Sequence, residues 1–213
     1  MLIGANPLLS SLDPTARWIA AAADDPARRL AHTLPEQLDF RPWAGLLHSL
    51  QSSALPASQL GAPLLLGPDG LEIAVEMAWC SRYQPFVDGK RFVGTVHVHP
   101  KGGAESFDAV DLAAFLRSDY PGFLDLLVTA ESASAVVRTR RFLYISADRV
   151  DRDPLLLEKL HTGFRAPSPA GPGSAEKAAA DARAAVSTVC HLYEIALYGG
   201  TIDAPLRLEY RPG

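Results

Sequence analysis

The sequence predicts an α/β (α+β) fold in which a sheet is flanked by helices, with extra helices at the N-terminus and a long helix near the C-terminus. Stretches with helical spacing of apolar residues alternate with short runs typical of strands. The chain has 213 residues, of which 48% are hydrophobic and 21% charged, so it can bury a substantial core. A Pro/Gly/Ser-rich segment, residues 164–174, separates a last helical stretch from the rest.

The N-terminal part predicts two helices. Residues 14–33 are rich in alanine and follow Asp13, a good N-cap, although Pro26 interrupts the pattern. Residues 41–53 carry one apolar stripe at helical spacing. The members of this stripe are Trp43, Leu46, Leu47 and Leu50.

The middle of the chain predicts several strands and a further helix. Short apolar or alternating runs bounded by Gly, Pro and Asp are typical of strands. Asp108 is a good N-cap for a helix that follows the glycine turn after residue 100. The predicted strands are 63–67, 71–79, 91–100 and 123–130, the predicted helix is 108–118, and a hairpin ends in 140–146.

The pattern changes after Asp153. A short helix at 155–161 precedes the linker, Ser174 can cap a long helix that reaches about Tyr198, and residues 206–210 read as a terminal strand. Two glycines at 199 and 200 are expected to end the long helix. The apolar positions of this helix are Val186, Val189, Tyr193 and Leu197.

These features divide the chain into three expected segments. Residues 1–40 form a helical extension, residues 41–153 form the central domain, and residues 154–213 supply a linker, the long helix and a short strand that pack on the core.

Composition excludes several classes of protein. The formal net charge is −4, and no basic run is longer than Arg138 to Arg141, so neither nucleic acid nor an anionic membrane is an expected partner. The two cysteines, Cys80 and Cys190, are too few for a disulfide framework and indicate small core residues in a reducing compartment. No apolar stretch reaches 18 residues and the N-terminus lacks a signal-peptide pattern, so a cytoplasmic location is expected.

The sequence HVHP, residues 97–100, carries the main chemical signal. Alternation along a strand places His97 and His99 on one side, with Cα atoms roughly 7 Å apart, so both rings can reach one metal ion. The helix that Asp108 caps can direct Asp111 toward them as a third ligand. Two imidazoles and a carboxylate leave a fourth position for water, as in catalytic zinc sites. The alternative is a solvated sheet face beside aspartates that only cap a helix.

Residues 94–116, GTVHVHPKGGAESFDAVDLAAFL, resemble the signature of the JAMM/MPN (JAB) metalloprotease family. Its members combine an HxHP strand end, a variable turn and Ser-x-x-Asp at the start of a helix. Upstream, WAGLLHSLQSSALPASQLGAPLLLG is similar to the family order of a helix, P-x-E-x-x-G and an LLLG strand. The resemblance covers roughly residues 41–150 and indicates a bacterial-type member with an MPN/JAMM-like mixed sheet.

The resemblance implies a function and a set of partners. His97, His99 and Asp111 match the family's zinc ligands, and a zinc-activated water would hydrolyse peptide or isopeptide bonds of ubiquitin-like proteins. The partner would be a ubiquitin-like protein or its conjugates, or another MPN-type subunit, and a homodimer is a further expectation.

Two departures from the family motif make the catalytic site degenerate. Ser58 stands at the position of the family's general-base glutamate. Asp108 stands at the position of the serine that helps to stabilise the oxyanion, with Ser106 close by as a displaced donor. A positioned base contributes about 10² to 10⁴ in rate, so its loss would leave little activity. Four glutamates are candidate substitutes, namely Glu36, Glu72, Glu76 and Glu105.

Three functional classes therefore stay open. The first is a JAMM-like zinc metalloprotease, and the second is a catalytically inactive scaffold or binding module of the same fold. The third, a metal-dependent phosphoesterase, would need more histidines and carboxylates than the chain offers. His191 and Glu194 form an HxxE pair that is expected to be a helix-surface pair rather than a second metal site.

Overall fold

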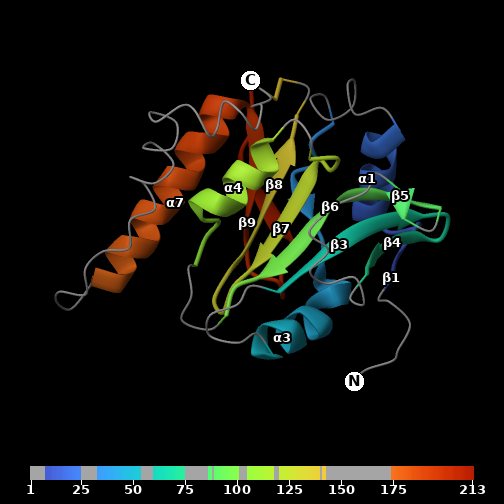
Figure 1. Cartoon of the computed structure of the whole chain (residues 1–213), viewed down its shortest axis with the longest axis horizontal. Helices are drawn as coiled ribbons and strands as arrows, with labels where there is room; N and C mark the ends of the chain where they lie inside the picture. The colour runs from blue at the N-terminus through green and yellow to red at the C-terminus, as the bar shows by residue number, and fades with distance from the viewer. Residues whose placement is uncertain are drawn as a thin grey trace.

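The computed structural model describes residues 8–24, 33–53, 60–74, 86–87, 89–100, 105–117, 120–139, 141–142 and 174–213. The strands within these ranges are β1 (Leu8–Ser10), β2 (Gln37–Leu38), β3 (Leu60–Gly67), β4 (Gly70–Ile73), β5 (Phe86–Val87), β6 (Lys90–Val98), β7 (Leu124–Val128), β8 (Ala133–Arg138), β9 (Ile195–Gly200) and β10 (Leu206–Tyr210). They form one ten-stranded mixed sheet in the order β1-β4-β3-β6-β7-β8-β9-β10-β2, and β5 also pairs with β6 (Figure 1).

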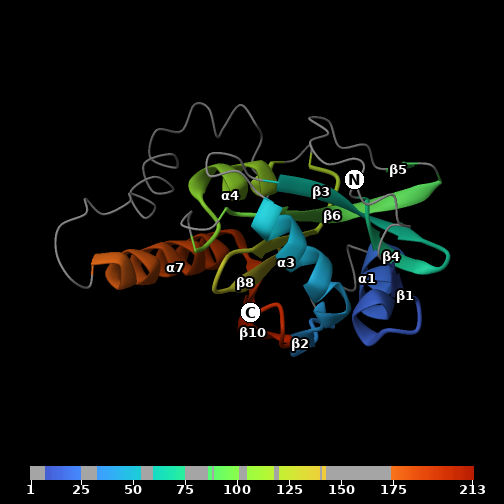
Figure 2. The same cartoon turned by 90° about the horizontal axis from the view of Figure 1, so that it is seen from below.

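Helices cover both faces of the sheet. The described helices are α1 (Pro14–Asp24), the short 3₁₀ helix η1 (Arg41–Trp43), α3 (Ala44–Ser53), α4 (Ala109–Leu116) and α7 (Ser174–Tyr193). The larger core cluster joins α1 and α3 to one face, with Ile19 and Leu47 fully buried. The second cluster joins α4 and α7 to the other face through Leu112 and Val189. Figure 2 shows α4 and α1 on opposite sides of the sheet.

The pairing of β6 with β7 is parallel, whereas the other described strand pairs are antiparallel. Parallel neighbours require a crossover connection, and α4 lies in that connection. Register places Thr95 opposite Asp125 and His97 opposite Leu127. Register-matched residues point to the same side of a sheet, and Leu127 belongs to the cluster under α4. The histidines of β6 therefore face the same layer as α4.

The two parallel strands approach each other closely at Gly94. A Cβ atom at this position would lie 1.8 Å from the carbonyl oxygen of Leu124. Gly122 is similarly confined, because its Cβ would lie 2.9 Å from the Cα of Gly94. Only glycine at residue 94 allows this register of β6 on β7, and that register aligns the polar residues described below.

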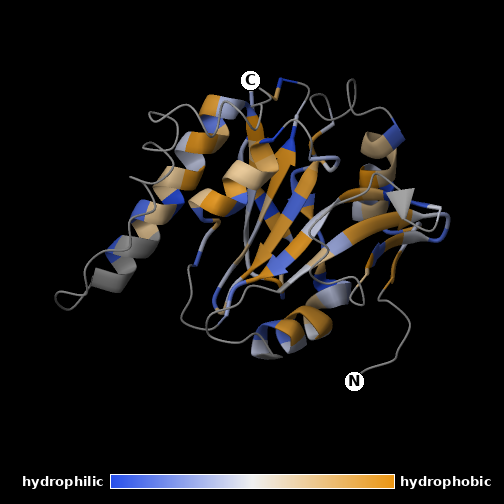
Figure 3. Cartoon of the chain, in the orientation of Figure 1, coloured by the Kyte–Doolittle hydropathy of each residue, from blue (hydrophilic) through white to orange (hydrophobic). Residues whose placement is uncertain are grey.

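Most of the described apolar pattern follows the sequence expectation. Figure 3 shows mainly apolar residues along the central strands, interrupted by hydrophilic ones. Asp13 caps α1, since its carboxylate accepts from the backbone N–H of Thr15 at 2.7 Å. The predicted fold class is confirmed at the level of a mixed α/β sheet with flanking helices. Residues 1–40 also contribute β1 and β2, which the sequence pattern does not indicate.

The prediction that the long helix reaches Tyr198 is wrong. Helix α7 ends at Tyr193, Glu194 adopts a positive φ of 54°, and residues 195–200 form β9 between β8 and β10. Leu197 and Tyr198 thus lie in a central strand whose two faces are both covered. A fully buried strand reads as a continuous apolar run, so the spacing of its residues cannot be told from that of a buried helix.

Several predictions fall outside the described residues. They are residues 25–32 of the helix predicted at 14–33, the second half of the strand at 71–79, most of the hairpin end at 140–146, the helix at 155–161, the linker up to residue 173, and the structural role of Cys80. Cys190 is buried as expected. Within the described ranges, none of the helices combines the length and apolar character needed to cross a membrane.

We expect Gly94→Ala to lower the free energy of unfolding by at least about 3 kcal/mol, because the added methyl group must push the backbone of β7 away. Urea unfolding followed by circular dichroism measures this change. Gly45→Ala is the matched control: a Cβ at this position in α3 meets no atom within 4 Å, so the variant should gain up to about 1 kcal/mol. Equal effects of the two changes would contradict the proposed close approach.

Candidate metal centre

Strand β6 presents two buried imidazoles at its C-terminal end. His97 is 8% exposed and His99 is 2% exposed, and their ring centroids lie 5.4 Å apart. The predicted alternation is confirmed, because both rings lie on the side that α4 covers. The alternative of a solvated sheet face is wrong for these residues.

Asp111 reaches the histidines because α4 begins with a capping box. The carboxylate of Asp108 accepts from the backbone N–H groups of Val110 and Asp111, at 2.8 and 2.9 Å. In return, the backbone N–H of Asp108 donates to Oδ2 of Asp111 at 3.0 Å. These bonds hold the Asp111 carboxylate in the first turn of the helix, on the side that faces β6.

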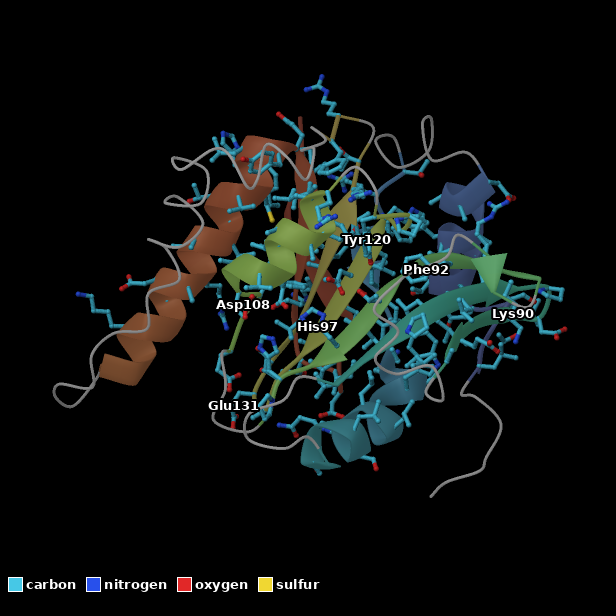
Figure 4. All side chains as sticks on the ribbon, viewed as in Figure 1. Lys90, Phe92, His97, Asp108, Tyr120 and Glu131 are labelled. Carbon is cyan, nitrogen blue, oxygen red and sulfur yellow. The ribbon has the colours of Figure 1, made fainter. Side chains whose placement is uncertain are left out.

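The three side chains converge on one small volume. Oδ2 of Asp111 lies 3.4 Å from Nε2 of His97 and 3.3 Å from Nε2 of His99. Ligand atoms of all three residues lie within 4.8 Å of one another. Figure 4 shows His97 on β6 beside the end of α4 that Asp108 caps. The group could hold a metal ion.

A fourth residue, Asp125 on β7, fixes the ring of His97 from behind. Nδ1 of His97 lies 3.2 Å from Oδ1 of Asp125, and the hydroxyl of Thr95 donates to the same oxygen at 2.6 Å. A carboxylate on the far nitrogen of a ligand imidazole selects the tautomer that turns the other nitrogen toward a metal. Sequence reasoning missed Asp125, although a lone acid within the apolar strand FLDLLVTA was a usable signal.

The electrostatics of this group favour a cation at His97. Nε2 of His97 is buried and has no hydrogen-bond partner, because its contact with Asp111 has the distance of an ion pair without hydrogen-bond geometry. Burial alone lowers the pKa of His97, but the charges of Asp125 and Asp111 and their contacts outweigh it and raise the pKa from 6.5 to about 10. Burial alone raises the pKa of Asp111, but its contacts with both histidines lower it overall.

The buried Nε2 of His97 decides whether a metal ion fits. An imidazole nitrogen that is buried beside two carboxylates needs either a proton or a metal ion. Two nitrogen donors and one carboxylate oxygen suit zinc and other borderline divalent ions, with a further position left for water. The residues present therefore fit such an ion.

The loop before α4 lines the site. The ring of Phe107 packs edge-on against His97, with centroids 5.5 Å apart. The Thr129 hydroxyl donates to Oε2 of Glu105. His99 N–H bonds to the carbonyl of Val128 at 2.9 Å, so the register continues and Thr129 lies next to His99, about 4.8 Å away at Cα. Glu105 is therefore held at the ligand end of the sheet.

The two predicted polar positions near this loop have local roles. The carboxylate of Asp108 accepts the backbone N–H groups of the helix cap, so it offers no hydrogen-bond donor where the resembled motif has a serine. Ser106 is buried and its hydroxyl donates to the carbonyl of Phe107 at 3.4 Å.

The other candidate bases are dispersed. Glu72 pairs with Lys90 at 2.7 Å, at the opposite end of β6 and about 23 Å along the strand from His97. Glu36 pairs with Arg211 at 2.5 Å beside β10, about four strand spacings or 19 Å from β6. Ser58 and Glu76 lie outside the described residues.

His191 and Glu194 do not form a pair on one face of a helix, contrary to the sequence prediction. Glu194 follows the end of α7, whereas Nδ1 of His191 lies 3.1 Å from the hydroxyl of Tyr210. Among the described residues, the only group of three or more potential metal ligands is His97, His99 and Asp111.

Comparison with known proteins finds no matching family description, no matching curated protein and no matching solved structure. The metal centre is therefore inferred from the geometry of these residues and the chemistry of their donor atoms.

We expect the chain to bind about one equivalent of zinc, and Asp111→Asn to weaken binding by at least about 100-fold. The amide oxygen of asparagine can still accept the N–H of Asp108, so the helix cap survives while the ligand charge is lost. Metal content after dialysis and chelator competition measure the effect. His48→Ala is the control, because the His48 side chain is exposed on α3 and pairs with Asp203 rather than with the metal centre. Undiminished zinc binding by Asp111→Asn would contradict the assignment.

We expect the metal-free chain to lose stability as the pH rises from about 6.5 to about 10. The folded-state pKa of His97 lies above its unfolded value, so the protonated ring stabilises the fold fully below 6.5 and that contribution disappears toward 10. Urea unfolding at intervals across this range measures the loss. The variant His97→Gln should show a flatter profile, and saturating zinc should remove the dependence, because the metal replaces the proton.

Proposed function

We propose that this chain is a zinc-dependent hydrolase of the JAMM/MPN type, acting on a peptide or isopeptide bond of a ubiquitin-like protein. The observation that carries the proposal is the buried convergence of His97, His99 and Asp111, each at the position that the HxHP and helix-start motif implies. The mixed α/β sheet and the helix that delivers Asp111 are consistent with it.

The protein residues divide the work at this centre. His97, His99 and Asp111 would hold the ion, Asp125 orients His97, and Phe107 shields one side of its ring. When bound, zinc polarises the scissile carbonyl and lowers the pKa of a water molecule to about 7. Among the candidate bases, Glu105 lies at the ligand end of the sheet, where its carboxylate accepts from the hydroxyl of Thr129. Glu105 would accept the proton there.

The second candidate function is an inactive binding module of the same type, partnered by a ubiquitin-like protein or another MPN-type subunit. Asp108 is committed to the helix cap, and Glu36 and Glu72 are committed to ion pairs distant from the ligands. Ser58 stands where the family has its base, so the metal centre can persist without turnover.

We expect the zinc-loaded chain to cleave an isopeptide-linked ubiquitin-like substrate slowly, and Ser58→Glu to raise the rate by about 10² to 10⁴, the contribution of a positioned general base. Cleavage is followed by gel electrophoresis and by release of a fluorescent amine. If Ser58→Glu binds zinc with the affinity of the parent chain and neither protein cleaves, the hydrolase proposal fails and the binding module stands.

Two controls separate a base from a change of shape or charge. Ser58→Gln introduces a side chain of the same size as glutamate but without a carboxylate that could act as a base, so this variant should not gain activity. The double variant Ser58→Glu with Asp111→Asn should lose it. If the parent chain is active by itself, Glu105→Gln should remove that activity while zinc affinity stays unchanged.

A further inference from the structure

A chain of buried polar groups continues behind His97. Oδ1 of Asp125 accepts from both the His97 ring and the Thr95 hydroxyl, so it is held from two sides. The Thr95 oxygen in turn lies 3.2 Å from the hydroxyl of Tyr120. Because the Thr95 proton is engaged by Asp125, Tyr120 is the donor in this contact, sharing its proton with the carbonyl of Leu124 at 3.3 Å. The chain therefore runs from the metal ligand to Tyr120.

Tyr120 is also tied to the C-terminal end of α4 through Arg138. The buried guanidinium of Arg138 donates to the carbonyls of Tyr120 at 2.8 Å and Arg117 at 2.7 Å, and to that of Phe115. Its Cζ lies 5.0 Å from the Tyr120 ring centroid and 5.1 Å from that of Phe115. The last carbonyls of a helix have no partner within the helix, and a cation is favourable there. Arg138 therefore joins the helix end and Tyr120 into one unit.

Arg138, the first residue of the short basic run at 138–141, is buried. Arg138 is 5% exposed because β8 turns it toward α4 rather than toward solvent. A buried arginine whose hydrogen bonds go to backbone carbonyls of another element positions that element, and here the element carries a metal ligand one turn away from Phe115.

We propose that Tyr120 is a positioning residue of the metal centre. Its hydroxyl fixes the ring of His97 through Thr95 and Asp125. Its backbone carbonyl and ring contact Arg138, which also bonds the C-terminal end of α4, the helix whose first turn supplies Asp111. Figure 4 shows Asp108 at one end of α4, Tyr120 close to the other, and His97 nearby on β6. The inference rests on the proposed metal centre, but the hydrogen-bond network exists in the chain itself.

Such a network is useful because the candidate ligands come from two different structural elements. His97 and His99 belong to the sheet, whereas Asp111 belongs to a helix that packs on it. If the helix shifted along the sheet, the distance between Asp111 and the two histidines would change by a similar amount. A bond network from the sheet through Tyr120 to the helix end resists this motion. Outer groups that orient metal ligands typically change affinity by about 10- to 100-fold.

The test is Tyr120→Phe, which removes one hydroxyl and keeps the ring on Arg138. We expect zinc affinity to fall about 10-fold and the visible absorption of the cobalt(II)-loaded protein to shift, because the His97 ring is less well oriented. Thr95→Val should produce the same changes, and the double variant should be no weaker than either single variant. Additive losses would show that the two hydroxyls act separately and would overturn the proposal.

The matched control is Tyr210→Phe, which also removes a hydroxyl bonded to a histidine ring, His191, but on the far strand β10. It should leave zinc affinity and the cobalt spectrum unchanged. A purely structural role of Tyr120 would lower the urea midpoint while the folded protein keeps the parent affinity and spectrum. Equal behaviour of the two tyrosine variants in those two measurements would overturn the proposal.

A measurement on the metal-free chain separates this proposal from the proposed function. Solvent exchange of the Nδ1 proton of His97, followed by nuclear magnetic resonance, should be several-fold faster in Tyr120→Phe than in the parent chain. If the parent binds neither zinc nor cobalt, the metal centre and hydrolase fail, yet faster exchange still supports the network. Unchanged exchange overturns the positioning role whatever the metal result.

Discussion

The parallel pairing of β6 with β7 is the constraint on which the rest of the structure depends. Parallel neighbours cannot be joined by a tight turn, so the chain crosses the sheet between them, and α4 is part of that crossing. This crossing lays the first turn of α4 over the C-terminal end of β6. The same pairing sets Asp125 beside Thr95, on the face that carries the histidines. One strand register thus positions the helix of Asp111, the strand of the two histidines and the carboxylate of Asp125 behind His97.

Burial then gives these polar groups their chemical character. Two carboxylates flank the ring of His97 in a region from which solvent is almost excluded, and both favour positive charge on the imidazole. A structure of this kind is stable when a proton or a metal ion supplies that charge. The hydrogen bonds of the capping box that begins α4 also hold the carboxylate of Asp111 in place. The same contacts therefore start the helix and position this candidate ligand.

Local sequence patterns predicted much of the fold, and the predictions that failed share one cause. Caps and apolar periodicity are properties of neighbouring residues, so Asp13, Asp108 and the apolar stripe of residues 41–53 indicated their helices correctly. The run that forms β9 was misassigned because a strand covered on both faces loses its alternation. The sequence did not indicate the burial of Arg138, because the carbonyls that accept its protons belong to residues distant along the chain.

The sequence by itself determined the three candidate ligands, since alternation in HVHP and the helix start at Asp108 are encoded within a few residues of each other. It also has Ser58 and Asp108 at the positions where the JAMM/MPN motif, which the sequence resembles, has a glutamate and a serine. Tertiary structure alone decided that Asp125, Thr95 and Tyr120 stand behind His97, that Glu105 is held beside the ligands, and that Glu36 and Glu72 are not. Those relations join strands far apart in the chain, and the pairing register that creates them is fixed by packing of the whole sheet, including the close approach at Gly94.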